Sequence, residues 1–418
     1  MKRYLILILL IGIASLTGVH ILNLWSGVSY SLRALNQDQL LRAAQIDLDN
    51  PEPFYRLSFL YQWDLLHVDL RKSNQYLQKA IGKNPLEQDY WLHLAMIFQK
   101  MGRKEESDRA LEKALLIYPT GYRGRWIAGN LLLQQGASEK ALPHFSYILA
   151  HYPDESRSIY EIWEGVAKDP DFILEKLIPK NFPSLHQYLT YLYEEGDKDK
   201  AQRVWRLKES LGYQSTWHDT IRHIKFLITQ GEIKEAFQIW RARLAVEGLP
   251  VPSDGNSITN EGFEIEKTLG SGFDWTINQA PGAEVSIDHS VAFEGKSSLK
   301  IRFNGRENID FQHVYQWVPL EPNTDYRLKV NMKTEGVTTQ SGPRMEVSGV
   351  DSVLYGVSES LTGDNDWKEL TIPFRTPTKS QGGLLRVRRQ KTENFDRLIF
   401  GTVWIDNVRL IEGRIRHD

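Results

Sequence analysis

Residues 88–119 read QDYWLHLAMIFQKMGRKEESDRALEKALLIYP, and this stretch decides the fold of the first half of the chain. Its first part places apolar residues at the i, i+3, i+4, i+7 spacing of one helical face: Trp91, Leu94, Ala95 and Phe98. After Gly102, its second part carries a seam of small and apolar residues: Ala110, Leu111, Ala114 and Leu115. Pro119 then stops helix propagation, because its ring clashes with the preceding turn and it lacks an amide hydrogen. The stretch therefore predicts a helical hairpin.

This hairpin is one unit of a repeat that is marked by proline. Four prolines follow one another at intervals of 34 residues: Pro51, Pro85, Pro119 and Pro153. That period is the length of the tetratricopeptide repeat, whose units are helical hairpins. Residues 88–119 resemble the tetratricopeptide pattern, with these residues at its marked positions: Trp91, Leu94, Ala95, Phe98, Leu111, Ala114 and Pro119. Ala95 stands where that pattern usually has a glycine.

Two later segments echo each other at 35 residues, since YLYEEGDKDKAQRVW aligns with FLITQGEIKEAFQIW and pairs Gly196 with Gly231. Between the two blocks, Asp169-Pro170 and two further prolines, Pro179 and Pro183, interrupt the period. We therefore expect one α-solenoid of tetratricopeptide-like repeats over residues 35–246, irregular in its middle.

The concave groove of such a solenoid usually binds a partner. The repeat register places one set of first-helix residues toward that groove, as candidate contacts to a protein partner: Asp89, Leu92, Met96, Arg123, Trp126 and Asn130. Trp126 is the strongest of them, because large aromatic side chains often anchor interfaces. The alternative is that these are ordinary solvated or packing positions.

Helical periodicity ends at residues 247–257, EGLPVPSDGNS, whose prolines, glycines and polar residues predict a linker. Beyond it, short segments alternate apolar and polar residues between turn signals: KSSLKIRF, YRLKVNMK, KELTIPF and LLRVRRQ. We expect one β-sandwich over residues 258–412.

The order of these segments carries a second resemblance. ITNEGFE, FEGKSSLKI, GDNDWKELTIPFRTP and VWIDNVRL succeed one another in a way that resembles the jelly-roll carbohydrate-binding modules attached to xylanases and other glucan-degrading enzymes. The resemblance covers roughly residues 258–410. It implies a jelly-roll sandwich that binds a glycan, although the same motifs stabilise sandwiches with other ligands.

The same resemblance implies a calcium site. VWIDNVRL, residues 403–410, reads as a strand that carries Asp406 in its middle, an unfavourable place for an acid. In that family a buried structural calcium ion ties the first strand to the last, which implies Glu264 and Asp406 as ligands, with a backbone carbonyl near Lys296. Ca²⁺ accepts carboxylate and carbonyl oxygens alike. The alternative is that Asp406 caps a turn or pairs with an arginine.

A candidate glycan site follows from strand alternation. In FQHVYQWVPL, Tyr315 and Trp317 share a face, and in LLRVRRQ, Arg386 and Arg388 share a face. If these faces meet, an aromatic pair beside two arginines suits an acidic sugar. The alternative is that the arginines form a solvated face and Trp317 packs.

Residues 1–28 predict a membrane anchor. Lys2 and Arg3 precede an apolar run over residues 4–24, and ~20 such residues can cross a bilayer. The positive flank keeps the N-terminus in the cytoplasm, so we expect a single-pass protein of a bacterial inner membrane with its bulk in the periplasm. A cleaved signal peptide is the competing interpretation.

Composition and missing motifs narrow the function. The formal net charge of −2 gives no support to a nucleic-acid partner, and the absence of cysteine excludes disulfides and thiolate metal sites. Neither G-x-S-x-G nor H-E-x-x-H occurs, and we expect no enzymatic activity. The sequence predicts a membrane-anchored envelope scaffold that docks a protein through its repeats and a glycan through its sandwich, in surface polysaccharide assembly or export. The alternatives are a purely protein-binding scaffold and a glycosidase-related protein.

Overall fold

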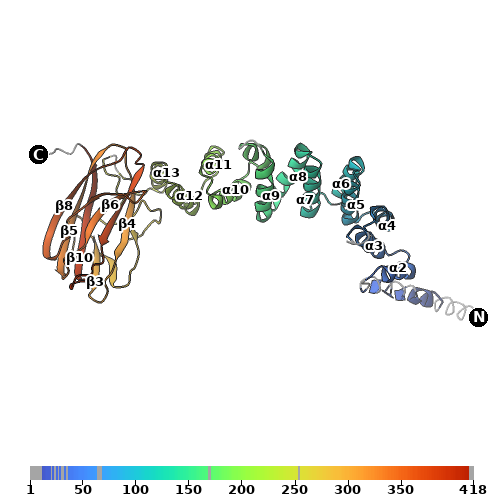
Figure 1. Cartoon of the computed structure of the whole chain (residues 1–418), viewed down its shortest axis with the longest axis horizontal. Coiled ribbons are helices and arrows are strands. Elements are labelled where there is room, and N and C mark those ends of the chain that lie inside the picture. The colour runs from blue at the N-terminus through green and yellow to red at the C-terminus, as the bar shows by residue number, and fades with distance from the viewer. Residues whose placement is uncertain are drawn as a thin grey trace, which may run out of the picture. The chain divides into compact units, whose positions relative to one another are not determined.

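The computed structural model describes residues 12–19, 21–22, 25–26, 28–29, 33, 36–63, 68–167, 171–252 and 255–413. The chain divides into two compact units, Met1–Glu195 with Lys200–Lys208, and Gly196–Asp199 with Glu209–Asp418. Helices precede strands throughout, as the sequence predicts (Figure 1). The helices are α2 (Gln37–Ile46), α3 (Glu52–Trp63), α4 (Leu70–Lys83), α5 (Gln88–Lys100), α6 (Lys104–Ile117), α7 (Tyr122–Gln134), α8 (Ser138–His151), α9 (Ser156–Val166), α10 (Phe182–Glu195), α11 (Lys198–Ser210), α12 (Trp217–Thr229) and α13 (Ile233–Val246).

The first unit is built from helical hairpins, with α3 packed on α4, α5 on α6 and α7 on α8 (Figure 1). Pro85, Pro119 and Pro153 each lie two residues past the end of a second helix, α4, α6 and α8. Gly102 and Gly136 turn the chain between paired helices with φ of 75° and 78°, a conformation that glycine adopts without strain. The predicted 34-residue hairpin repeat is confirmed.

Small residues let these helices approach closely. Ala95, Ala114 and Ala128 are fully buried, and the hydroxyl of Ser107 on α6 donates to the Ala95 carbonyl at 2.9 Å. A Cβ at Gly129 would lie 2.6 Å from the Phe145 ring, so this position has no room for a side chain. The seam predicted on residues 110–115 is therefore a packing surface.

The predicted irregular middle is also present. After α9, residues Ile173–Leu177 form a π-helical turn, η2, and the regular pairing of helices is interrupted there. Residues 168–170, which include Asp169-Pro170, lie outside the described residues.

The second unit contains a sandwich of two antiparallel sheets, as predicted (Figure 1). Sheet A has the order β1-β4-β9-β6-β7 and sheet B the order β2-β3-β10-β5-β8. Apolar side chains from the inner faces of both sheets form one core, in which Phe303, Val314, Val387 and Val403 are fully buried. The strands are β1 (Thr276–Ile277), β2 (Ala283–Asp288), β3 (Ser298–Asn304), β4 (Phe311–Pro319), β5 (Asp325–Val337), β6 (Arg344–Gly349), β7 (Leu354–Val357), β8 (Gly363–Arg375), β9 (Gly382–Arg389) and β10 (Phe400–Glu412).

The last hairpin belongs to the same compact unit as the sandwich. Helix α13 packs against β4, and Phe237 on α13 meets the Phe273 ring edge-on at 5.3 Å. Lys234 pairs with Glu321 at 2.6 Å. The compact unit therefore begins before α12, earlier in the chain than the predicted linker at residues 247–257.

The predicted anchor lies largely outside the described residues, which omit residues 4–11, 20, 23 and 24 of the 4–24 run. Among the residues that are described, no helix is both long enough and apolar enough to span a bilayer.

Candidate functional site

The four predicted glycan-binding residues do share one face of sheet A. Tyr315 lies directly opposite Arg386 across the β4–β9 pair, and Trp317 lies opposite Leu384. Residues of equal parity on one strand point to the same side, so Arg388 joins this face. The neighbouring residues of opposite parity, such as Gln316 and Val387, are fully buried. The four therefore lie on the outer face of sheet A.

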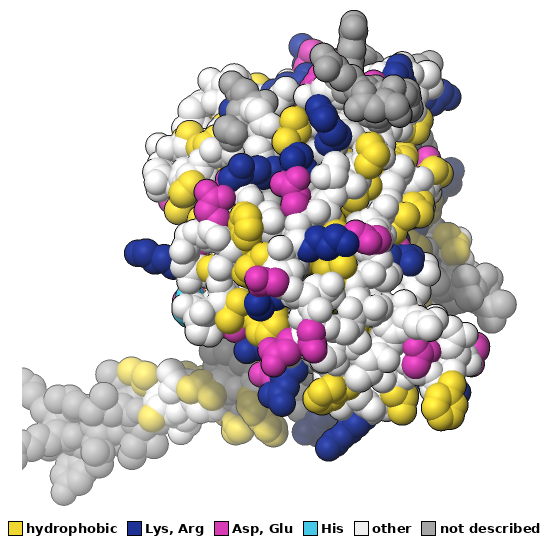
Figure 2. Space-filling model, turned by 90° about the vertical axis from the view of Figure 1, so that its left-hand side faces the viewer, with side chains coloured by type: hydrophobic (Ala, Val, Ile, Leu, Met, Phe, Trp, Pro, Cys, Tyr) yellow, Lys and Arg dark blue, Asp and Glu magenta, His cyan; other side chains and the backbone are white. Residues whose placement is uncertain are grey.

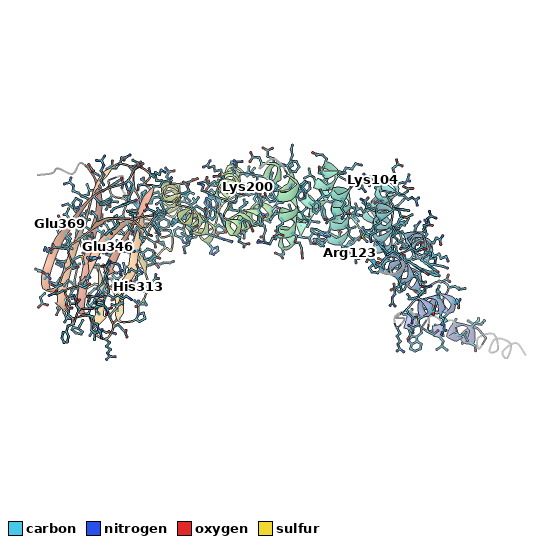
Figure 3. All side chains as sticks on the ribbon, in the orientation of Figure 1. Lys104, Arg123, Lys200, His313, Glu346 and Glu369 are labelled. Carbon is cyan, nitrogen blue, oxygen red and sulfur yellow. The ribbon has the colours of Figure 1, made fainter. Side chains whose placement is uncertain are left out.

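A buried carboxylate sits among the arginines of this face. Glu346, which Figure 3 labels, lies on β6 and is only 2 % exposed. It pairs with Arg344 at 2.7 Å and with Arg386 at 3.0 Å. Arg388 lies 3.8 Å from Glu346 and 2.6 Å from Asp310, and its hydrogen bond lowers the pKa of the Asp310 carboxyl. The arginines are thus largely neutralised by acids, which cancels much of the predicted attraction for an acidic sugar.

Helix α13 covers one end of the face. A Cβ at Gly382 would lie 2.4 Å from the Ile233 side chain of α13, so the helix approaches the β9 backbone closely. The backbone amide of Trp317 donates to the Gly272 carbonyl at 2.8 Å, and the Trp317 and Ile228 side chains both lie within 3.4 Å of the place that a Gly272 Cβ would take. Trp317 is half-buried at this covered end. The uncovered end holds Tyr315 and the Arg386 side chain, which is 25 % exposed.

The predicted metal residues lie close together around one loop. The backbone amides of Phe293 and Glu294 donate to Asp406 Oδ2 at 2.7 and 3.1 Å. The amides of Lys296 and Ser297 donate to Glu264 Oε1 at 2.7 and 3.0 Å. Asp406 is fully buried, whereas Glu264 is exposed, so only one of the two acids carries the full cost of burial.

These contacts decide between the alternatives for Asp406. Among the described residues no lysine or arginine pairs with it, so the structure gives the arginine pair no support. It does cap the 293–294 turn, and a β-bulge follows it, with Asn407 at a φ of 52°. Burial raises the pKa of the Asp406 carboxyl, and the nearby charge of Glu264 also raises it. Hydrogen bonds from backbone amides lower this pKa, but by less than burial raises it.

Two carboxylates beside one loop supply the type of oxygen that calcium accepts. Two carboxylates repel each other beside one loop, and a divalent cation between them would offset that repulsion. Glu264 and Asp406 would hold the ion, with the backbone carbonyl near Lys296 that the resemblance implies. Among the described residues no group of three or more acidic, histidine or cysteine side chains is arranged so that it could hold a metal ion, so carbonyls or water would have to complete the shell.

The predicted groove residues of the solenoid fall into two groups. Arg123 is exposed and pairs with Asp89 at 2.9 Å, with both on first helices. Trp126 is half-buried, stacked on Tyr122 at 6.0 Å and edge-on to Phe145 at 5.8 Å, and Asn130 donates to the Trp126 carbonyl.

Leu92 and Met96 face the packing of the hairpins. Leu92 is 1 % exposed in the core of the first unit, so the prediction that it faces an open groove is wrong. Met96 is half-buried against the same core. Leu92 belongs to a buried cluster that includes residues of the neighbouring hairpins, such as Leu77 and Ala128.

Sequence reasoning missed Glu346 and Arg344, which form ion pairs on the sheet A face. RMEVSG, residues 344–349, places both residues on one side of a strand by alternation. Which strand they neighbour follows only from the β6–β9 register, in which Glu346 lies opposite Arg386.

Comparison with known proteins finds a match in the sandwich. The carbohydrate binding domain family matches residues 255–394. A curated relative, the tRNA(Glu)-specific nuclease WapA of Bacillus subtilis subsp. natto (strain BEST195), is 27% identical over 169 residues, which cover 38% of this chain and 7% of the relative. The tRNA nuclease WapA of Bacillus subtilis (strain 168) is 25% identical over 169 residues, with the same shares covered. The chain thus spans about 7% of the length of these curated relatives.

Solved structures resemble the two parts separately. A crystal structure of MamA covers 29% of this chain and 69% of its own, at 21% identity and a TM-score of 0.26. A structure titled CBM4 structure and function covers 38% of this chain and 100% of its own, at 17% identity and a TM-score of 0.29. The structure of TmCBM61 in complex with β-1,4-galactotriose covers 38% of this chain and 99% of its own, at 18% identity and a TM-score of 0.26.

Proposed function

We propose that this chain is a membrane-anchored scaffold of the bacterial cell envelope, in which the repeats dock a protein partner and the sandwich holds a glycan. The observation that carries the proposal is the family match over residues 255–394, which includes strands β1 to β9 of the two-sheet sandwich and stops before β10. Helical repeats on the same chain support the scaffold part, because such repeats commonly present binding surfaces. Surface polysaccharide assembly or export would need such a coupling of protein and glycan. The proposal assigns the chain no catalytic role.

The glycan part is tested with a glycan array probed by the intact chain and by two variants. Tyr315→Ala removes the aromatic ring at the uncovered end of the sheet A face, and Tyr118→Ala removes an exposed tyrosine from the first unit. We expect the wild type and Tyr118→Ala to retain the same sugars and Tyr315→Ala to lose them. Failure of the wild type to retain any glycan would refute the glycan part.

Calcium is part of the proposal. Held by Glu264 and Asp406, the ion would supply positive charge that ties the 293–297 loop to β10 and neutralises the two acids. These residues would then fix the chain ahead of β3, without contacting a ligand themselves.

The anchor is the remaining part. Residues 4–24 would hold the chain in the inner membrane with the repeats and sandwich in the periplasm, on the strength of the charged flank and the length of the apolar run. Protease added to spheroplasts would digest the repeats. Complete protection of the chain would refute this orientation.

A purely protein-binding scaffold is the second candidate, and one observation favours it. Helix α13 and the 269–275 loop cover the Trp317 end of the sheet A face, which leaves less of that face open to a polysaccharide. A chain that captures a protein partner through its repeats but retains no glycan on the array would support this candidate.

A further inference from the structure

A cavity of about 500 Å³ opens on the other sheet, away from the face of Tyr315 and Arg386. It lies at the β2 edge of sheet B, where β2 pairs with β3 and β3 with β10. Its volume falls within the range that holds small ligands, roughly 300–1,000 Å³. The side chains that line it are mostly polar, with one exposed aromatic ring among them: Gln279, Glu284, Arg302, Asn304, Arg306 and Phe400.

Two arginines of this cavity differ from those of sheet A. Within the described part of the chain, no hydrogen bond or ion pair reaches the guanidinium of Arg302 or of Arg306. On sheet A, by contrast, Arg344, Arg386 and Arg388 are all paired with acids. Free guanidiniums in a concave site can take a carboxylate in a bidentate manner, because they present two parallel N–H donors.

The backbone around the cavity is firmly held. The amide of Asn304 donates to the Gly282 carbonyl at 3.1 Å, and the amide of Arg306 donates to Asn304 Oδ1 at 2.9 Å. Gly305 has a φ of 73° and lies so close to Phe400 that a Cβ would stand 3.2 Å from the Phe400 side chain. The turn that carries Arg306 is thus fixed against the strand that carries Phe400.

Phe400 supplies a surface for the apolar side of a sugar. Its side chain is 51 % exposed although it lies within a strand, opposite Asn304 in the β10–β3 pair. The C–H face of a pyranose ring can lie against such an aromatic ring while amide groups bond its hydroxyls. Asn304 and Gln279 bring amide groups to the same cavity.

We propose that this cavity is a binding site for a uronic-acid residue of an acidic oligosaccharide. Arg302 and Arg306 hold the sugar carboxylate, the Phe400 ring packs against the pyranose, and Glu284 with the amides accepts or donates hydrogen bonds to hydroxyls. The inference rests on the proposed function of the sandwich as a glycan-binding part, and it names both a second site and the class of sugar.

An extended polyanion such as a nucleic acid suits the surface less well. Glu284 lines the cavity and Glu307 lies at its rim, against Gly282. The face of the sandwich in Figure 2 carries basic and acidic side chains interspersed, without a continuous basic stripe. A single carboxylate among hydroxyls matches two guanidiniums beside an acid better than a row of phosphates does.

The test uses calorimetric titration of the intact chain with hexasaccharides of galacturonate, glucuronate and mannuronate, each also as its methyl ester. The ester keeps the size of the sugar and removes its charge. We expect at least one acid form to bind about tenfold or more tightly than its ester, as the loss of a charged hydrogen-bonded pair implies. The double variant Arg302→Ala with Arg306→Ala should lose this preference, and Phe400→Ala should weaken both forms.

Arg327→Ala is the matched control, because Arg327 is an exposed arginine on β5 of the same sheet, outside the cavity. It should bind as the wild type does. The proposal is overturned if acid and ester bind with equal affinity, or if no acid form binds. It is also overturned if Arg327→Ala loses binding while the variants of the cavity keep it. If Tyr315→Ala then abolishes binding of neutral glycans, the proposed function stands without this site; if the array retains no glycan at all, both fall.

Discussion

The exposed ion pairs that link successive helical hairpins contrast with two buried charged groups of the sandwich. In the repeats, Lys83 pairs with Asp49 and Arg123 with Asp89, each across 34 residues, and these groups lie at the surface. In the sandwich, Asp406 receives a bond from a residue 113 positions away, and Arg389 binds carbonyls up to 80 positions away, both fully buried. Exposed pairs contribute little to stability and buried polar groups much, so substitutions should affect the two regions unequally.

The largest effect is expected at Arg389. Its guanidinium donates to the carbonyls of Ser341, Ile309 and Arg397, and so joins three loops at one end of the sandwich. Arg389→Met leaves these carbonyls without their buried donor and should cost about 3 kcal/mol or more. The free energy of unfolding is measured by chemical denaturation and, separately, by hydrogen exchange in β9, with Arg327→Met as the exposed control. A loss of unfolding free energy no larger than that of the control would contradict this prediction.

The next effect concerns calcium. An ion bound only by the folded sandwich stabilises it by about 2.7 kcal/mol at a hundredfold excess over its Kd. The melting temperature of the intact chain should therefore fall in chelator and recover with added calcium. Asp406→Asn keeps the size and one oxygen and should weaken the response. Indifference of the wild type to chelator, with no metal in the purified protein, would end this part of the account.

A smaller effect is expected in the repeats. Ala114 is fully buried between helices, and Ala114→Trp should overpack that seam at a cost of about 1–3 kcal/mol. Leu116, which is 76 % exposed two residues further along α6, gives the matched control Leu116→Trp. Equal unfolding free energies of the two variants would show that the seam tolerates a large side chain.

The smallest effect is a difference in pH response. Burial, and then the charges of Lys100 and Arg123, lower the pKa of His93 to about 4, so its contribution to stability is complete above the unfolded value of ~6.5 and is lost as pH falls. The pKa of Asp406 is raised chiefly by burial, so without calcium its contribution is complete at low pH and is lost as pH rises past the ordinary aspartate range.

Hydrogen exchange in chelator, corrected for intrinsic rates, should therefore show α5 losing protection and β10 gaining it as pH falls from about 7.5 to 4.5. Parallel slopes in the two elements would contradict the assignment of these groups.

The same contrast explains what the sequence could predict. The effects of Pro85, Pro119 and Gly102 are local, because each residue lies at the helix end or turn that it determines. The repeat and its period were therefore predictable. Strand alternation likewise placed Tyr315 and Arg386 on one face.

Partners distant in the chain were not predictable. Nothing near Arg386 indicates that Glu346, 40 residues away, neutralises it, and nothing near Trp317 indicates that Ile233 brings α13 over that end of the sheet. The prediction that Leu92 faces the groove was wrong for a related reason. Neighbouring residues of a helix lie on different faces, so a shift of one residue exchanges a groove position for a packing position.

The central claim is that the sandwich binds a glycan whereas the repeats bind a protein partner. Hydrogen exchange of the intact chain, with and without a glycan that the array retained, tests this claim most directly. The account predicts slower exchange in strands of the sandwich, at β4 and β9 or at β2 and β3, and unchanged exchange in α3 to α8. Protection confined to the helical repeats, with none in the sandwich, would contradict it.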